Sequence, residues 1–364
     1  MSAIIREKIS LFAICCVWGT LFGLKTVLAK EETVSLVFAG DISFSDPVRT
    51  DVHRNFYCYK DTLSHVAQYV RDADISFANL ESPIVPKKSL ENKNVGPKVI
   101  FLYAEKQSVS ALRLAGFDVM TIANNHLNDF GEFPVNYTVN TLKNAGIKAV
   151  GATYGPFNSH QVPVILERKS LKIGVLAYCL THGGKTDKVQ NCTEVRSLFK
   201  EGPAIYRRDV ARVDVERLKA RKVDVIVILM HWGREYRPRM NGLQRRIATY
   251  LTSLGVHVII GSHPHVMQPY SYRDKRFVAY SLGNLLFSHE WTPEKFRLPF
   301  FSMKATRNGR LIRTEVSRKG VVRVQYLPYE IRKNPTNHCL QPIPLNQDGW
   351  IDVCGQTDTM CLKH

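Results

Sequence analysis

The sequence predicts an α/β fold with a largely parallel or mixed sheet, and two observations support this. Short runs of β-branched residues alternate with helical stretches from residue 34 to about residue 290. After residue 300 the hydrophobic pattern changes to a period of two, which is typical of antiparallel strands. The chain has 364 residues, 45% of them hydrophobic and 23% charged. This composition excludes a disordered, collagen-like or coiled-coil protein and allows one large domain or two ordinary ones.

The predicted elements follow one another in a regular order. The strands are expected at residues 34–39, 74–80, 117–122, 162–167, 171–178, 223–229, 256–260 and 277–280. The helices are expected at residues 61–71, 105–115, 134–144, 209–221 and 243–254. A glycine ends three of these helices, at Gly116, Gly146 and Gly255, as is usual at helix C-termini. The strands at 162–167 and 171–178 are expected to form a hairpin.

The region after residue 300 is predicted to add antiparallel strands that complete a sandwich. These strands are expected at residues 301–305, 311–316 and 321–327, with Asn308-Gly309 as a hairpin turn. The region is strongly basic, and its outer face is expected to be basic too. Its basic residues are Lys304, Arg307, Arg310, Arg313, Arg318, Lys319, Arg323, Arg332 and Lys333. We expect one domain over residues 34–334 and a cysteine-containing tail over residues 335–364.

Residues 1–29 have the pattern of a signal peptide. A charged head precedes an uncharged run over residues 9–24, and Val27-Leu28-Ala29 is a small-residue cleavage site before Lys30. The run is about 16 residues long, shorter than the roughly 20 that cross a bilayer. The protein is therefore expected to be secreted or extracytoplasmic. The alternative is an uncleaved N-terminal segment that anchors the protein to a membrane.

The charge of the chain indicates an anionic partner. Lysine and arginine number 50 against 32 aspartate and glutamate, which gives a formal charge of +18. Removal of residues 1–29 takes away three basic residues and one acidic residue, so 18 − 2 = +16 remains. A surplus of this size fits a polyphosphate, a polycarboxylate, a membrane surface or a nucleic acid. The export signal and the lack of a nucleic-acid motif argue against nucleic acid.

Six cysteines remain after residue 29, an even number that permits disulfides in an exported protein. They are Cys58, Cys179, Cys192, Cys339, Cys354 and Cys361. Their pairing stays open, because six cysteines allow 15 connectivities. The last three lie in the C-terminal tail and could attach it to the body of the protein. Two glycosylation sequons, at Asn136 and Asn191, would matter only in a eukaryotic source.

Polar side chains directly follow five of the predicted strands. They are Asp41, Glu81, Asn125 with His126, His231, and His263 with His265. Ligands of open α/β sheets bind at the carboxyl ends of the strands, so we expect these side chains to meet at one edge. Together they form a ligand set suited to a divalent metal such as Zn, Mn or Fe. The His263-Pro264-His265 spacing directs both imidazoles to the same side.

Each of these residues alone has a simpler interpretation. Asp41 could cap a helix, Asn125 could be a turn residue, and His231 could be a packed core histidine. Glu81 could be a solvated acid in a loop. Their joint occurrence at five strand ends favours a metal site over these alternatives.

Several motifs carry a resemblance to a known family over residues 34–290. They are Gly40-Asp41, Asn79-Leu80-Glu81, Asn124-Asn125-His126-Leu127-Asn128-Asp129, His231-Trp232-Gly233, Gly261-Ser262-His263-Pro264-His265-Val266 and Tyr280-Ser281-Leu282-Gly283-Asn284. In this order they resemble CapA-type capsule-synthesis proteins, whose bacterial members are associated with poly-γ-glutamate capsules. That family is similar to a branch of the calcineurin-like metallophosphoesterases. The resemblance implies a four-layer αββα sandwich of metallophosphoesterase type.

The resemblance also implies roles for the residues at the strand ends. Asp41 and His265 would hold one metal ion, and Glu81 would take the bridging position. The second ion would be held by Asn125, His231 and His263. His126 would protonate the leaving group, and Asp129 would orient His126. Ser43 stands where metallophosphoesterases usually have a histidine, so one or two ions are both possible.

Two functions from different classes follow. The first is an exported metal-dependent hydrolase that acts on a phosphoester or on an anionic polymer such as poly-γ-glutamate. Basic residues near the site would hold the anion, with Lys87, Lys88, Arg234, Arg237 and Arg239 as candidates. The second is a non-catalytic accessory protein that binds or exports an anionic polymer. The imidazole missing at residue 43 and the basic surplus favour this alternative.

Overall fold

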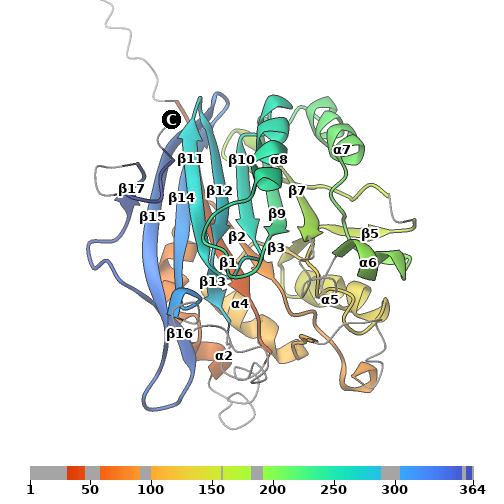
Figure 1. Cartoon of the computed structure of the whole chain (residues 1–364). Coiled ribbons are helices and arrows are strands. Elements are labelled where there is room, and N and C mark those ends of the chain that lie inside the picture. The colour runs from red at the N-terminus through yellow and green to blue at the C-terminus, as the bar shows by residue number, and fades with distance from the viewer. Residues whose placement is uncertain are drawn as a thin grey trace, which may run out of the picture. The chain divides into compact units, whose positions relative to one another are not determined.

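The computed structural model of the chain describes residues 31–45, 58–90, 100–156, 159–181, 192–287, 304–354 and 358–362. Within these residues, two β-sheets pack face to face and helices cover their outer faces (Figure 1). The predicted signal segment lies outside the described residues. No helix of the described part is both long enough and apolar enough to span a bilayer.

The first sheet is mixed and has β1 (Val34–Ile42) near its centre. In spatial order its strands are β16 (Leu340–Pro344), β15 (Gly320–Lys333), β14 (Asn308–Ser317), β1, β2 (Ile75–Leu80), β3 (Val119–Thr121) and β4 (Lys148–Val150). The strands from β1 to β4 run parallel, and those from β14 to β16 are antiparallel. The short strand β13 (Asn284–Leu286) pairs with the end of β1, and β17 (Ile351–Asp352) pairs with β15.

The second sheet has a parallel centre with an antiparallel strand at each edge. Its order is β11 (Met267–Arg273), β12 (Arg276–Leu282), β10 (Val258–Ser262), β9 (Val225–Gly233), β7 (Leu171–Thr181) and β6 (Val164–Arg168). The predicted hairpin is confirmed as β6 and β7. A separate pair, β5 (Ala152–Tyr154) and β8 (Glu201–Pro203), lies outside both sheets.

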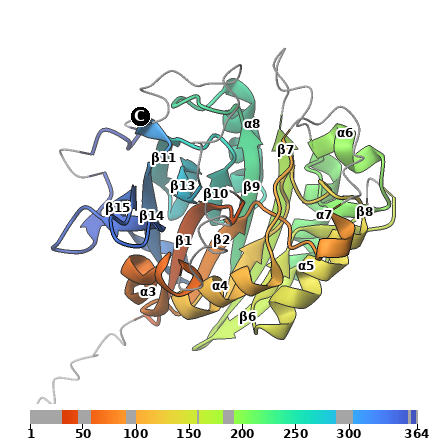
Figure 2. The same cartoon turned by 90° about the horizontal axis from the view of Figure 1, so that it is seen from below.

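Three buried clusters separate four layers. One cluster fills the space between the sheets and includes Phe38 and Phe77, whose rings stack 4.8 Å apart. A second packs α3 (Ser64–Arg71), α4 (Val109–Ala115) and α5 (Phe133–Asn144) on the first sheet. A third packs α7 (Arg208–Ala220) and α8 (Gly242–Ser253) on the second sheet. Figure 2 shows α8 on one side of the strands and α3 and α4 on the other, so the predicted αββα sandwich is confirmed.

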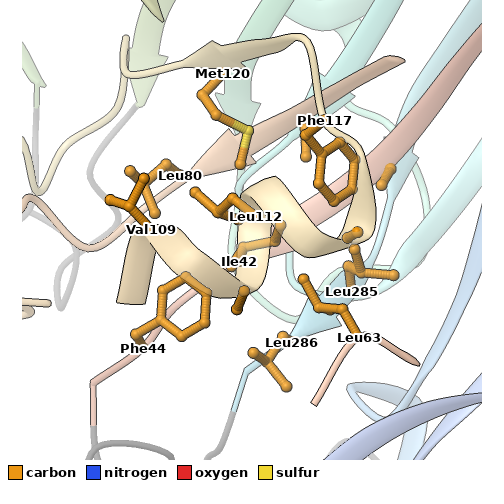
Figure 3. Close-up of a cluster of buried hydrophobic side chains, with 14 of the residues drawn as sticks. Ile42, Phe44, Leu63, Leu80, Val109, Leu112, Phe117, Met120, Leu285 and Leu286 are labelled. Carbon is orange, nitrogen blue, oxygen red and sulfur yellow. The ribbon is translucent and has the colours of Figure 1, made fainter. Parts of the chain in front are cut away.

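The contact between α4 and the first sheet shows how the helical layer is held. Figure 3 shows Val109 and Leu112 of this helix among Ile42, Leu80 and Met120, which come from the strands or their ends. Leu112 is completely buried. A helix of seven residues is too short to be stable alone, so packing of this apolar face is what keeps it folded.

Local sequence signals define the ends of several helices. Gly116 ends α4 in the left-handed conformation, with φ of 92°, as the sequence predicted. At the start of α8, the Asn241 side chain accepts a hydrogen bond from the backbone N–H of Gln244 at 2.9 Å, and the Gln244 side chain accepts one from the backbone of Asn241. The described part also contains α2 (Cys58–Asp61), α6 (Cys192–Ser197), η1 (Lys87–Ser89) and η2 (Lys106–Ser108).

The region after residue 300 differs from the prediction in two ways. Asn308-Gly309 is not a hairpin turn, because both residues pair with β15 as the first residues of β14. The β14–β15 turn falls instead at Arg318 and Lys319. The strand predicted at 301–305 is wrong at residues 304 and 305, which are helical, and residues 301–303 lie outside the described part.

Acidic side chains pair with several arginines of this region. Among the described residues, Arg310 pairs with Asp358, Arg318 with Asp224, Arg323 with Asp352, and Arg332 with Glu330. Two of these acids, Asp352 and Asp358, come from the last part of the chain.

Disulfides attach the cysteine-containing tail to the body. Cys339 pairs with Cys58 of α2, across 281 residues of sequence, and Cys354 pairs with Cys361. The remaining pair is Cys179 with Cys192. All six cysteines after residue 29 are therefore paired.

Candidate metal centre

Five of the predicted ligands come together where four strands end. Asp41 lies near the end of β1, and Glu81 follows β2 directly. His231 lies near the end of β9, and His263 and His265 follow β10. These five side chains are all buried, and each belongs to at least one group whose ligand atoms lie within 4.8 Å of one another. The two sheets thus bring together residues that are up to 224 positions apart in the sequence, since 265 − 41 = 224.

The first group of ligand atoms comes from Asp41, Glu81 and His265. The Nδ1 atom of His265 lies 3.6 Å from Oδ2 of Asp41, and its Nε2 atom lies 3.6 Å from Oε1 of Glu81. One imidazole therefore lies between two buried carboxylates. These separations are longer than hydrogen bonds, and they suit atoms that share a cation between them.

The second group comes from Glu81, His231 and His263. The Nε2 atom of His231 lies 3.9 Å from Oε1 of Glu81 and 2.8 Å from Oδ1 of Asn125. The rings of His231 and His263 are 4.8 Å apart. Because Glu81 belongs to both groups, its carboxylate lies where one residue can contact two adjacent ions.

A third group includes a residue that the sequence analysis did not identify. Glu235 offers a carboxylate oxygen within 4.8 Å of ligand atoms of His263 and His265. It is half-buried and lies in the irregular segment that follows β9. The only sequence signal was its position four residues after His231, and no periodic pattern marks that segment.

The electrostatics of the site fit a divalent cation. Burial raises the pKa of Asp41, although His265 and hydrogen bonds from Asn79 and from the backbone of His263 act in the opposite direction. Burial also holds the pKa of His263 well below its usual range. The imidazole is therefore neutral and has a lone pair that can bind a metal ion. Within the described part of the chain, the buried Nδ1 atom of His263 has no hydrogen-bond partner. Neutral imidazoles beside buried carboxylates are the donor set that such a cation requires.

His126 lies beside these groups and is held by Asp129. The carboxylate of Asp129 lies 2.7 Å from Nδ1 of His126 and also accepts a hydrogen bond from the backbone N–H of Leu102 at 2.7 Å. This contact leaves Nε2 directed toward the ligand groups, 3.9 Å from Oε1 of Glu81. The ring is 3% exposed, so it faces the site rather than bulk solvent.

Other polar side chains support the ligands from behind. The amide of Asn79 donates to Oδ1 of Asp41 at 2.7 Å, and Asn124 donates to the Asn79 carbonyl at 3.1 Å. Ser262 lies 3.0 Å from Nδ1 of His231, and Asn284 lies 2.9 Å from Nδ1 of His265. Such contacts fix the orientation of a ligand and which nitrogen it presents to a cation.

The backbone around the ligands is unusual in two places. His263 and His265 have φ of 93° and 56°, in a region that residues with side chains rarely adopt. Such strain is common at functional sites. At Gly40, a Cβ atom would collide with the carbonyl of Gly283, so only glycine lets β1 approach this closely. The same approach brings the N–H of Asp41 to the Gly283 carbonyl at 3.1 Å.

Ser43 occupies a buried position close to Asp41 in the sequence. Its hydroxyl accepts a hydrogen bond from the backbone N–H of Ser45 at 3.2 Å. The candidate ligand group that contains Asp41 has one imidazole, from His265, among the described residues. The second group has two imidazoles, from His231 and His263.

The basic residues proposed to hold an anion lie in two places. Arg234, Arg237 and Arg239 are exposed in the segment after β9. This segment is attached to β11, because the side chain of Gln268 donates a hydrogen bond to the backbone carbonyl of Arg237 at 2.8 Å. Lys88 instead lies over the ring of Phe133, 5.6 Å from its centroid. Of the two sequons, Asn136 lies in α5 and Asn191 lies outside the described residues.

Comparison with known families gives a match over most of the chain. The family model described as bacterial capsule synthesis protein PGA_cap matches residues 35–289. Capsule biosynthesis protein CapA of Bacillus anthracis is 27% identical over 266 residues, 73% of this chain and 62% of that protein. PGA biosynthesis protein CapA of Bacillus subtilis is 25% identical over 323 residues, 88% of this chain and 76% of that protein. The chain thus covers less than two thirds of the Bacillus anthracis relative.

Solved structures with a similar arrangement share little sequence with this chain. A hypothetical protein from Thermus thermophilus has a TM-score of 0.45 and 16% identity, covering 81% of this chain and 99% of that one. The calcineurin-like phosphoesterase YfkN from Bacillus subtilis has a TM-score of 0.44 and 13% identity, covering 80% and 88%.

Proposed function

Since this chain belongs to the bacterial capsule synthesis protein family PGA_cap, we propose that it is a metal-dependent hydrolase acting on an anionic substrate. The substrate is a phosphoester or an anionic polymer such as poly-γ-glutamate. The observation that carries the proposal is the pair of buried ligand groups that share Glu81. A buried carboxylate in contact with three imidazoles is costly to maintain unless a cation stabilises it, so the arrangement points to bound metal.

The chain provides ligands for one or two divalent ions. Asp41 and His265 would hold one ion, and Asn125, His231 and His263 would hold the other, with Glu81 between them. The Zn, Mn and Fe ions suit this mixture of carboxylate and imidazole donors. Glu235, whose carboxylate lies near His263 and His265, would be an additional ligand. When bound, the ions would supply Lewis-acid activation of water and compensation of negative charge at the reacting centre.

His126 is the proposed general acid. The Asp129 carboxylate accepts a hydrogen bond from the Nδ1–H of His126, and this contact fixes the ring. The Nε2 atom is then left to deliver a proton to the leaving group. The Leu102 N–H keeps the Asp129 carboxylate in place.

The substrate is proposed to be anionic for two reasons. The three exposed arginines Arg234, Arg237 and Arg239 follow β9, so they lie on the segment that also contains the candidate ligand Glu235. The relatives are named for capsule biosynthesis and PGA biosynthesis, and PGA is a polyanion. Guanidinium groups in this position would pair with carboxylates or phosphates of the substrate.

A non-catalytic accessory protein is the second candidate function, and Ser43 favours it. The first ligand group contains one imidazole, and the Ser43 hydroxyl is used by the local backbone. A weakened first site would leave a protein that binds metal and polymer without turnover. Both candidate functions use the same metal ligands, but only the hydrolase requires His126 as a general acid.

The test measures hydrolysis of phosphoesters and of γ-glutamyl polymers by the purified protein. If the protein is a hydrolase, we expect its activity to be abolished by a chelator and restored by Mn²⁺ or Zn²⁺. His126→Ala is expected to keep its bound metal and lose about 10²- to 10⁴-fold in kcat, the usual contribution of a general acid. An equally active His126→Ala protein, or activity that persists after chelation, contradicts the proposal. Metal binding with no turnover of either substrate supports the accessory function instead.

The location of the protein is part of this proposal. We propose that the protein acts outside the cytoplasm, exported by the segment over residues 1–29. Six paired cysteines support an oxidising compartment, because disulfides persist there.

A further inference from the structure

A groove lies on the outer face of the second sheet, outside the metal centre. It has a volume of about 510 Å³ and is lined by residues of α8, β11 and β12. None of the ligands described above lines it. A cavity of this size is within the range of small-ligand sites and holds far more than one inorganic ion.

The charge of this groove is positive and only partly compensated. Arg245, Arg273 and Arg276 line it, against a single acid, Asp274. Arg273 forms an ion pair with Asp274 at 3.4 Å. Among the residues that the structure describes, Arg245 and Arg276 have no ion-pair partner. Two guanidinium groups are therefore available to an anionic ligand.

The floor of the groove is apolar and buried, and the partly buried apolar side chains that line the groove are Met240 and Leu362. Ala248 of α8 and Val278 of β12 are buried there, and Tyr280 is 5% exposed. Tyr280 is supported by Trp232, whose indole N–H donates to the Tyr280 carbonyl at 2.9 Å. Because Tyr280 exposes almost no ring surface, it offers no face on which a nucleotide base could stack. The lining suits a ligand whose charges are spaced along a partly apolar chain.

The end of the chain forms one wall of the groove. Leu362 lines it, and its N–H donates to the Tyr270 carbonyl at 2.9 Å. The preceding residue, Cys361, is bonded to Cys354, which fixes this wall. Met240, from the same segment after β9 that contains Glu235, also lines the groove. The groove and the metal centre thus share a segment of chain.

We propose that this groove binds a segment of a carboxylate-bearing polymer, at a site separate from the metal centre. Arg245 and Arg276 pair with carboxylates of the polymer, and the partly buried side chains of Met240 and Leu362 pack against its methylene groups. The identity of the polymer as poly-γ-glutamate rests on the proposed function. The groove then holds one part of the polymer while the metal centre acts on another part of the same molecule.

The test measures the affinity of a fluorescein-labelled γ-glutamyl oligomer by fluorescence anisotropy. The double variant Arg245→Gln/Arg276→Gln is expected to raise the Kd at least about tenfold, because it removes both guanidinium groups that pair with carboxylates of the oligomer. The control is Arg221→Gln/Arg246→Gln, which removes the same charge from positions outside the groove. An equal loss of affinity in both double variants, or in neither, overturns the proposal.

Two further measurements address folding and specificity. Thr249→Trp fills the groove from the exposed side of α8 without changing charge, and it is expected to weaken binding as well. Oligomer with methyl-esterified carboxylates is expected not to bind, and tight binding of this neutral oligomer contradicts the proposal. If no hydrolysis is found while the groove variants still lose binding, the proposed hydrolase fails and this inference stands. If hydrolysis is found and the groove variants bind normally, the inference alone fails.

Discussion

At the scale of single residues, Asn79 connects the two halves of the candidate metal centre. Its side-chain amide donates to Asp41 at 2.7 Å and lies 3.3 Å from Nδ1 of His231. Its carbonyl oxygen is in turn held by Asn124. One amide therefore orients a carboxylate of the first ligand group and an imidazole of the second.

We expect Asn79→Ala to lower the affinity of the protein for Zn²⁺ or Mn²⁺ by about 10- to 100-fold, the usual effect of removing a residue that supports a ligand. Competition with a coloured chelator measures this affinity directly. Asn144→Ala is the matched control, because Asn144 is exposed at the end of α5. Unchanged affinity in Asn79→Ala contradicts the role given to this amide.

Most of the candidate ligands could be predicted because each follows a buried strand directly. Asp41, Glu81, His231 and His263 are polar residues at the ends of apolar runs, and parallel strands bring such ends to one edge. Glu235 could not be predicted in this way. It lies in an irregular segment beside Tyr236, whose φ is 58°, and its position depends on contacts between segments that no local pattern encodes.

At the scale of elements, the close packing of β1 depends on Gly40. We expect Gly40→Ala to lower the free energy of unfolding by about 1–3 kcal/mol, because the added methyl group collides with the backbone of Gly283. Urea unfolding measures the change. Gly242→Ala, at the open start of α8, is the control and should change stability little. A Gly40→Ala protein as stable as wild type shows that β1 and the Gly283 segment can separate.

The layer formed by α4 gives a second prediction at this scale. Leu112→Ala is expected to destabilise the protein by about 2–5 kcal/mol, because Leu112 is fully buried between the helix and the sheet. Leu114→Ala changes the same residue type in the same helix, but Leu114 is 50% exposed. Its expected effect is within about 0.5 kcal/mol. Equal effects of the two variants are incompatible with the observed packing of α4.

The central strands and long helices could be predicted because each has an apolar pattern of its own. The short strands β4, β5 and β13 could not, since three residues give no period and their pairing is decided by neighbouring strands. The Asn308-Gly309 pair shows the same limit. Asn-Gly favours a turn locally, but the long strand β15 offers partners to both residues, and strand pairing prevails.

At the scale of the whole molecule, the disulfides connect distant parts of the chain. The sequence could not predict their pairing, because six cysteines allow 15 connectivities and Cys58 and Cys339 lie 281 residues apart. In the chain-entropy account, a loop of 281 residues is worth roughly 5–6 kcal/mol, and the loop from Cys354 to Cys361 is worth about 2 kcal/mol. We therefore expect Cys58→Ser/Cys339→Ser to lower stability more than Cys354→Ser/Cys361→Ser in urea unfolding. The reverse order contradicts this account.

Asp74 contacts both sheets, and its pKa leads us to expect that the free energy of unfolding depends on pH. Its carboxylate accepts hydrogen bonds from Ser35 of β1 and from Lys169, in the turn between β6 and β7, at 2.8 to 2.9 Å. Burial alone would raise the pKa of Asp74, but these partners outweigh it and lower the pKa below its ordinary value of 3.8. A lowered folded pKa means that the carboxylate stabilises the fold above the unfolded pKa and that this contribution is lost as the pH falls through the folded pKa.

The comparison of wild type with Asp74→Asn tests this. The difference in free energy of unfolding between the two proteins is expected to be constant from neutral pH down to about pH 4 and to shrink in more acidic solution. Lys169→Met should reduce the same difference by removing the cation. A difference that stays constant into strong acid shows that Asp74 does not stabilise the fold as a carboxylate.

The central claim is that the strand-end side chains hold divalent metal, and metal content per chain tests it most directly. Inductively coupled plasma mass spectrometry should find one or two equivalents of Zn, Mn or Fe in the wild-type protein. Glu81→Gln should lose metal from both positions, and His231→Ala from the second only. His160→Ala should keep the wild-type content, since His160 contacts Asp214 away from the centre. A Glu81→Gln protein that folds and keeps the full metal content would contradict the account.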